Sequence, residues 1–148
     1  MPKIDLDAIA QINATTYPTP FDQAVAGRRY RRLGPAVGLT DFAASEVTLE
    51  PGAWSSQRHW HESEDEFAVM IEGAAVLIED DGRTPLNPGD LVAWPKGVRN
   101  GHHLINETDR PCRFVVFGGG TRSWGEYSDI DMKFTADGTY TRKDGTPY

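Results

Sequence analysis

The segment HWHESEDEFAVMIEG, residues 59–73, is the most informative about the fold, and it contains side chains that can bind a metal ion in the interior of that fold. Side chains two apart on a β-strand point to the same face, so His59 and His61 can both face an interior while Trp60 faces away. The acidic run after them ends in Glu66, which opens an apolar strand and would therefore hold its carboxylate rigidly. We expect these two histidines and this glutamate to be ligands of one metal ion.

The other two of the four histidines are adjacent, at His102 and His103, so the chain keeps its imidazoles in two tight clusters. If a strand begins near these residues, alternation turns only one of them inward, and we favour His102. Three neutral imidazoles and one carboxylate form an open site suited to Fe, Mn, Co, Ni, Cu or Zn. The predicted cofactor is one divalent metal ion per chain, held by His59, His61, Glu66 and His102.

The composition fits one turn-rich globular domain. The chain has 148 residues, of which 15 are Gly and 10 are Pro, and this length is enough for a single core. A net charge of -7 opposes binding to a phosphate backbone, so we expect no nucleic-acid partner. The sequence has neither an apolar run long enough to span a bilayer nor a leader-like start, so we expect a cytoplasmic protein with no membrane partner.

One basic run, Arg28-Arg29-Tyr30-Arg31-Arg32, interrupts the acidic balance. A run of this kind is more often a solvated strand or turn than an anion site. An arm that crosses a partner subunit is a further interpretation.

From residue 42 onward, short apolar runs alternate with Gly, Pro and Asp turns. Because no long helical pattern separates these runs, they predict an all-β barrel or sandwich. Gly118–Arg122, after the last run, is interpreted as a flexible connector, and Asp137-Gly138 as the turn of a final hairpin. The expected strands are Phe42–Leu49, Phe67–Ile71, Ala74–Ile78, Leu91–Trp94 and Arg113–Phe117.

The N-terminal part has a different character. Asp5 and the apolar pattern behind it predict a short amphipathic helix over residues 5–12. Two prolines within residues 15–21 predict an extended arm. We expect residues 1–40 to pack on the barrel or on a partner subunit, and residues 41–148 to form the barrel, within one structural domain overall.

The histidine segments are also where the chain resembles the cupin superfamily. The residues that match its first motif are Gly52, His59, His61, Glu66 and Gly73. Those that match its second motif are Gly89, Pro95, Gly97, His102 and Asn106. The resemblance extends nearly end to end to small bacterial single-domain cupins. It implies a double-stranded β-helix, which is a jelly roll of two facing sheets, usually paired into a homodimer through strands and N-terminal arms.

One part of the second motif departs from the family. Four residues lie between Gly97 and His102, which is more than the family has, so Asn100 occupies the usual position of the fourth ligand. Either a longer loop brings His102 back into place, or the site is a weakened His-His-Glu set. We favour the longer loop, because His102 keeps its spacing to Asn106.

Function is expected to depend on the metal. The leading hypothesis is an enzyme whose metal binds two cis oxygens of a small metabolite, such as a sugar, a sugar phosphate or a hydroxy or keto acid, and acts as a Lewis acid in isomerase, lyase or dioxygenase chemistry. The sequence identifies no general base, and Glu64 and Tyr30 are the candidates. Arg58 and Arg99 would either bind an anionic group of the ligand or pair with nearby acids.

The rival hypothesis is a non-catalytic cupin that binds or senses a small ligand. Aromatic residues do not decide between the two. Trp54, Trp94 and Trp124 are expected in core or dimer packing, and Trp60 is expected to pack outside the site.

Overall fold

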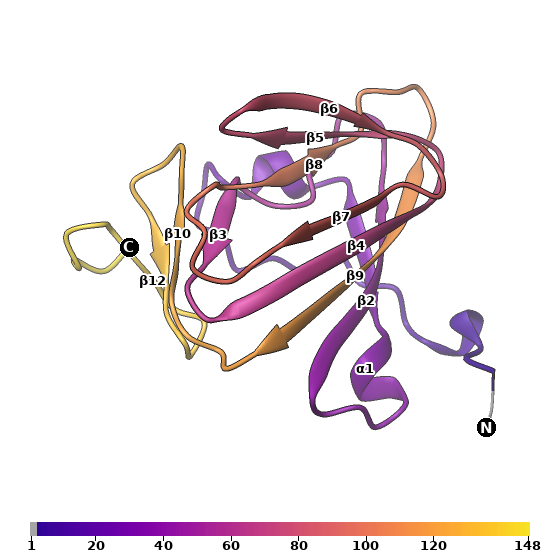
Figure 1. Cartoon of the computed structure of the whole chain (residues 1–148), viewed down its shortest axis with the longest axis horizontal. Helices are drawn as coiled ribbons and strands as arrows, with labels where there is room; N and C mark the ends of the chain where they lie inside the picture. The colour runs from indigo at the N-terminus through magenta and orange to yellow at the C-terminus, as the bar shows by residue number, and fades with distance from the viewer. Residues whose placement is uncertain (1–2) are drawn as a thin grey trace.

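The computed structural model describes residues 3–148, and this part of the chain is built almost entirely of β-strands (Figure 1). Its helices are short: η1 (Leu6–Ala8), η2 (Gln23–Val25) and α1 (Leu33–Ala36). Among the described residues, no helix has the length and apolar character needed to cross a membrane. The strands are β1 (Arg28–Arg32), β2 (Phe42–Leu49), β3 (His59–His61), β4 (Glu64–Glu72), β5 (Ala75–Glu79), β6 (Gly82–Leu86), β7 (Leu91–Trp94), β8 (His103–Ile105), β9 (Cys112–Gly120), β10 (Gly125–Tyr127), β11 (Lys133–Phe134) and β12 (Tyr140–Thr141).

The strands form three antiparallel sheets. The largest has the order β1-β2-β9-β4-β7, and the others have the orders β12-β11-β10-β3 and β6-β5-β8. In Figure 1 the β6-β5-β8 sheet lies above the large sheet, while β3 and β10 stand at one side of the space between them. This is the predicted jelly roll, and the expected strand positions and the last hairpin are confirmed.

The interior of the large sheet is apolar for most of its length. Leu49 on β2, Met70 on β4 and Phe114 on β9 are at most 3% exposed and belong to one hydrophobic cluster. Full burial of such a side chain stabilises a fold by about 1.5–3 kcal/mol. Alternation along β4 puts Glu66 on the same face as Ala68 and Met70, so the glutamate lies at the edge of this core.

The N-terminal segment lies against its own barrel. The expected helix over residues 5–12 is shorter than predicted: Asp5 accepts a hydrogen bond from the Asp7 amide at 3.1 Å, but only Leu6–Ala8 is helical. The chain then becomes extended because Ile12 pairs with Tyr30 of β1 through two backbone hydrogen bonds. β1 itself falls within the first forty residues and is an edge strand of the large sheet.

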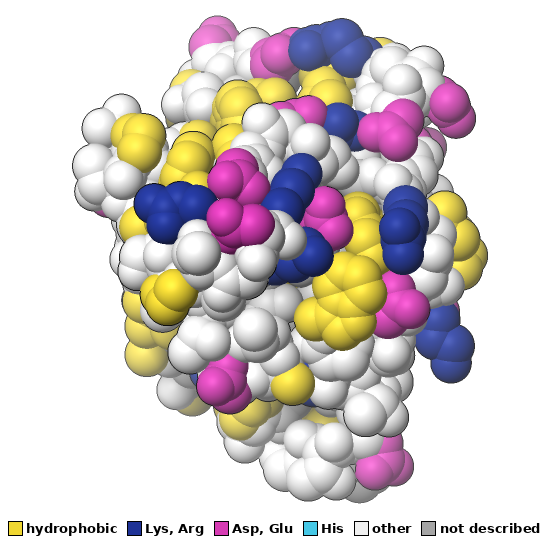
Figure 2. Space-filling view, turned by 90° about the vertical axis from the view of Figure 1, so that its left-hand side faces the viewer, with side chains coloured by type: hydrophobic (Ala, Val, Ile, Leu, Met, Phe, Trp, Pro, Cys, Tyr) yellow, Lys and Arg dark blue, Asp and Glu magenta, His cyan; other side chains and the backbone are white. Residues whose placement is uncertain are grey.

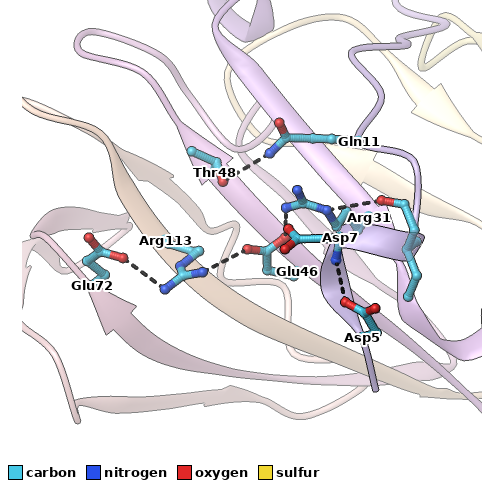
Figure 3. A network of polar contacts seen from close by, with 9 residues as sticks. Asp5, Asp7, Gln11, Arg31, Glu46, Thr48, Glu72 and Arg113 are labelled. Carbon is cyan, nitrogen blue, oxygen red and sulfur yellow. Dashed lines mark hydrogen bonds and ion pairs between the residues drawn. The ribbon is translucent and has the colours of Figure 1, made fainter. Parts of the chain in front are cut away.

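The outer face of the large sheet carries a buried carboxylate (Figure 3). Glu46 is 2% exposed and is paired with Arg31 at 2.7 Å and with Arg113 at 3.4 Å. Arg113 also pairs with Glu72 at 2.8 Å, and the Arg31 side chain donates to the Ile9 carbonyl. Since a buried charge is tolerated only when it is paired, this network ties the N-terminal segment and four strands, β1, β2, β9 and β4, together.

Candidate functional site

Four polar side chains from three parts of the chain meet in the barrel interior. His59 and His61 point the same way from β3, and their Nε2 atoms are 3.1 Å apart. Glu66 on β4 places Oε2 at 3.3 Å from the Nε2 atom of His61 and at 2.7 Å from the Nε2 atom of His102. The structure therefore brings the four predicted ligands together, while Trp60 between the two β3 histidines is buried at 4% exposure on the other face.

Three of the donors, from His59, His61 and Glu66, all lie within 4.8 Å of one another, which is close enough to hold one metal ion. His102 adjoins this group through its contact with Glu66. Ligand atoms at 2.0–2.2 Å from a metal lie about 3.0–3.5 Å from each other, which is the range of most of these contacts. The Nδ1 atom of His59 is 2.9 Å from the Gln57 carbonyl oxygen, and only a protonated nitrogen can bond to a carbonyl. The lone pair of His59 is then on Nε2 and faces the other donors, so the residues fit a divalent transition metal.

Charge favours the metal-binding forms of two of the ligands. Burial, followed by the neighbouring His61 and His102, lowers the pKa of His59 to about 3, so its imidazole is neutral. Burial opposes ionisation of Glu66, but hydrogen bonds from His102 and His61 hold its pKa well below the ordinary value. Burial also opposes the charge on His61, but the carboxylates of Glu64 and Glu66 raise its pKa to about 9. A metal ion would displace that proton.

The unusual spacing before His102 is accommodated by a longer loop. His102 and His59 face each other across an antiparallel bridge, in which the His102 amide donates to the His59 carbonyl at 2.9 Å. Asn100 lies outside the cluster, and its side-chain oxygen accepts a hydrogen bond from the Asp80 amide. His103 faces away, with Nδ1 at 3.0 Å from the Ser56 carbonyl. Of the two adjacent histidines, His102 is therefore the one directed inward.

The four side chains open onto a cavity of about 410 Å³. Sequence reasoning missed several of its walls. Trp94, expected in packing, stacks on His102, and Arg28 and Arg32, from the run interpreted as solvated, also line the cavity. Arg28, Tyr30 and Arg32 are every second residue of β1, so the sequence puts them on one face of a strand, but it does not indicate which face is inside. Further lining residues include Tyr17, Tyr30, Ser45, Ser55 and Phe114.

The two arginines expected to bind ligand lie elsewhere. Arg58 is held by Asp129, with contacts of 2.6 and 2.8 Å, and also pairs with Asp80. The guanidinium of Arg99 lies over the ring of Trp60 at 5.1 Å, and neither arginine lines the cavity. Figure 2 shows the face of the molecule beside β10 and β12, where acidic and basic side chains gather and no histidine is visible.

The two candidates for a general base are also separated. Glu64 lies 3.4 Å from the Nδ1 atom of His61, behind the ring, and does not line the cavity. Tyr30 does line it, and its hydroxyl donates to the Ala14 carbonyl at 3.3 Å. Glu64 can thus orient His61, whereas Tyr30 can contact a bound molecule.

Comparison with known proteins agrees with this architecture. The crystal structure of a polyketide cyclase from Streptomyces resistomycificus is 21% identical, with a TM-score of 0.65 over 80% of this chain and 79% of that one. A predicted oxalate decarboxylase from Thermotoga maritima is 17% identical, with a TM-score of 0.64 over 80% of this chain and 99% of that one. At this identity the likeness concerns the fold alone. None of the curated proteins compared matches the chain.

Two further comparisons show the family to which the chain belongs. The crystal structure of a sugar phosphate isomerase of the cupin superfamily from Silicibacter pomeroyi is 47% identical, with a TM-score of 0.94 over 99% of this chain and 96% of that one. A family model described as the cupin domain matches residues 45–118, a span that contains all four clustered side chains. The chain therefore belongs to the cupin superfamily.

Proposed function

We propose that this protein is a metal-dependent enzyme that acts on a small, oxygen-rich metabolite. The observation that carries the proposal is the convergence of His59, His61, Glu66 and His102 beside a cavity large enough for such a molecule. When bound, a divalent metal would supply Lewis acidity at two cis oxygens of the substrate. The residue types suit Fe, Mn, Co, Ni, Cu and Zn alike.

Isomerisation of a sugar or sugar phosphate is the reaction we place first. Its support is the 47% identity to the Silicibacter pomeroyi protein, which is named a sugar phosphate isomerase. Lyase and dioxygenase chemistry on a hydroxy or keto acid use the same kind of ligand set, and the identity of the metal selects among them. The alternative is a cupin that binds a small ligand without converting it.

The residues of the chain have separate tasks in this proposal. Glu64 is a positioning residue, because its carboxylate faces the outer nitrogen of His61 and does not line the cavity. The indole of Trp94 covers His102 and limits the access of water to that ligand. Tyr30, on the cavity wall, is the remaining candidate for proton transfer to or from a bound substrate.

The adjacent histidines provide a matched test of the metal site. Elemental analysis of protein purified without added metal is expected to find one metal ion per chain in the wild type and in His103→Gln, and a much lower content in His102→Gln. His103 lies next to His102 but is directed away from the cluster, so the pair controls for a general loss of folding. Equal metal content in the two variants would contradict the proposed ligand set.

The reaction is tested with the metal-loaded protein. Sugar phosphates, sugars and hydroxy or keto acids are incubated with and without oxygen, and products are followed by NMR. Turnover without oxygen supports isomerase or lyase chemistry, and oxygen-dependent turnover supports a dioxygenase. A protein that retains its metal and binds a metabolite unchanged would instead be the non-catalytic cupin.

A further inference from the structure

The four arginines of β1 divide into two pairs by the face on which they lie. Arg29 and Arg31 lie outside the barrel and are paired with carboxylates: Arg29 with Glu50 at 3.4 Å, and Arg31 with Glu46 at 2.7 Å. Arg28 and Arg32, on the opposite face of the same strand, line the cavity that contains the histidine cluster. The strand therefore supplies two positive charges to the wall of that cavity.

Neither cavity arginine is neutralised by the protein. Within residues 3–148, no carboxylate lies within 4.0 Å of the guanidinium of Arg28 or Arg32. Arg28 donates to the Ser55 carbonyl at 2.7 Å and to the Ala14 carbonyl at 3.3 Å, and its buried Nε has no hydrogen-bond partner in the described residues. A cation fixed by neutral carbonyls retains its full charge for a further partner.

The two guanidinium groups lie over the same aromatic ring. Their Cζ atoms lie 5.4 Å and 5.9 Å from the centre of the Tyr30 ring, which is placed between Arg28 and Arg32 along the strand. A smaller cavity of about 230 Å³, roofed by residues 14–17 of the N-terminal arm, has the same three side chains in its wall. The arginines thus stand where this outer cavity adjoins the inner one.

Among the described residues, the only carboxylate that lines the main cavity is already engaged. Glu66 is in contact with His61 and His102, so it is directed to the metal cluster rather than to the arginines. In a chain of net charge -7, Arg28 and Arg32 thus bring two positive charges to the wall of this cavity. The planar fork of a guanidinium matches the two oxygens of a carboxylate or phosphate group.

We propose that Arg28 and Arg32 form an oxyanion subsite, which holds a phosphate or carboxylate group of the molecule whose other oxygens face the histidine cluster. The proposal deepens the proposed function by naming an anionic metabolite as its substrate class. It rests on that function only for the part of the ligand that faces the histidine cluster. The subsite requires no metal to attract an anion.

Binding of two simple probes tests the subsite. Inorganic phosphate and malonate are titrated by calorimetry into the full chain, both as purified and after removal of metal with a chelator. We expect at least one probe to bind the wild type in both states, and Arg32→Gln to weaken its Kd by at least about tenfold, as expected for the loss of a charged hydrogen bond. Whichever probe binds more tightly identifies the group as phosphate or carboxylate.

Arg29→Gln is the matched control, because it removes the same charge from the opposite face of the same strand. It is expected to leave the Kd unchanged. Arg28→Lys serves as a second variant that keeps the charge but loses the fork, and we expect intermediate binding. The Arg32 side chain makes no hydrogen bond to the described residues, so Arg32→Gln should fold normally.

The outcomes separate the subsite from the proposed function. If neither probe binds, or if Arg32→Gln and Arg29→Gln bind equally well, the subsite is overturned while a metal found in the protein would still support the enzyme. If binding depends on Arg32 but the wild type never takes up metal, the subsite stands and the metal-dependent function fails.

Discussion

The indole ring of Trp94 lies flat against the imidazole of His102, with ring centres 3.9 Å apart and planes inclined by 7°. The indole is itself fixed, because its Nε1 donates to a carboxylate oxygen of Glu79 at 3.1 Å. This stacking sets the plane of the His102 ring and hence the direction of its Nε2. His102 lies just before β8, after the loop whose length departs from the family's second motif. Its orientation therefore depends more on neighbouring side chains than that of His59 and His61, which lie within β3.

Replacement of Trp94 should therefore weaken metal binding without removing a ligand. We expect Trp94→Leu to lower metal affinity by about tenfold, the lower end of the effect of residues that support a metal ligand. Trp94→Phe should retain part of the affinity because a ring still covers His102. Competition with a chromophoric chelator measures the Kd. Trp124→Leu, on the outer side of Trp60, is the control, and an equal loss in that variant would contradict the role of the stacking.

Local patterns in the sequence were sufficient to predict the five strands with apolar runs, the last hairpin and the common direction of His59 and His61. Alternation on a strand has a fixed period, so the direction of His59 and His61 relative to Trp60 follows from their order alone. The turns at Asp80 and Asp137 could be predicted for a similar reason, since their residue types favour tight turns. These features depend on neighbours in sequence, and the structure confirms them.

Features that depend on distant partners could not be predicted. Gly118–Arg122 was interpreted as a flexible connector, and this is wrong for its three glycines: they continue β9 because β4 pairs with them along Glu64–Glu66. Which arginines of β1 face inward depends on how β1 pairs with β2, and Trp94 meets His102 only after the barrel closes. Arg58 was placed by acids that lie 22 and 71 residues away along the chain.

Glu64 is expected to support the site through His61. Its carboxylate faces the Nδ1 atom of that ring, so Glu64→Gln should make His61 a weaker ligand and lower metal affinity by about tenfold. Glu62→Gln, in the same acidic run, is the control, because the Glu62 side chain makes no ion pair among the described residues. Both affinities can be measured by chelator competition, and a comparable loss in the two variants would show that only the charge of the run matters.

Gly73 should be intolerant of any side chain. Its φ is 70°, and a Cβ there would lie 2.7 Å from the Pro111 carbonyl oxygen. Gly38 has a similar φ of 76° but open space around it, so Gly38→Ala reports the backbone strain alone, about 1–2 kcal/mol. Gly73→Ala is expected to cost about 1–3 kcal/mol more because of overpacking. Urea unfolding measures the free energy of unfolding of both variants. Equal losses would mean that the backbone around Pro111 and Cys112 moves aside without an energetic cost.

The pair of Arg58 with Asp129 should give stability that depends on pH. Hydrogen bonds and charge from Arg58 lower the pKa of Asp129 in the folded chain, so its contribution is present above the unfolded pKa near 4 and is lost as the pH falls through the folded value.

We expect Asp129→Asn to reduce the free energy of unfolding by about 1 kcal/mol or less at pH 7, because Asp129 is partly exposed to solvent. The difference from the wild type should shrink from about pH 4 downward, since only the wild type carries the titrating carboxylate. Urea unfolding at stepped pH measures this difference. Asp109→Asn, in an exposed pair with Arg110, is the control and should show no such trend. A difference in the free energy of unfolding that stayed constant at all pH values would contradict the role of charge. The stabilisation would then come from uncharged contacts of Arg58, such as its hydrogen bond to the Gly101 carbonyl, next to His102.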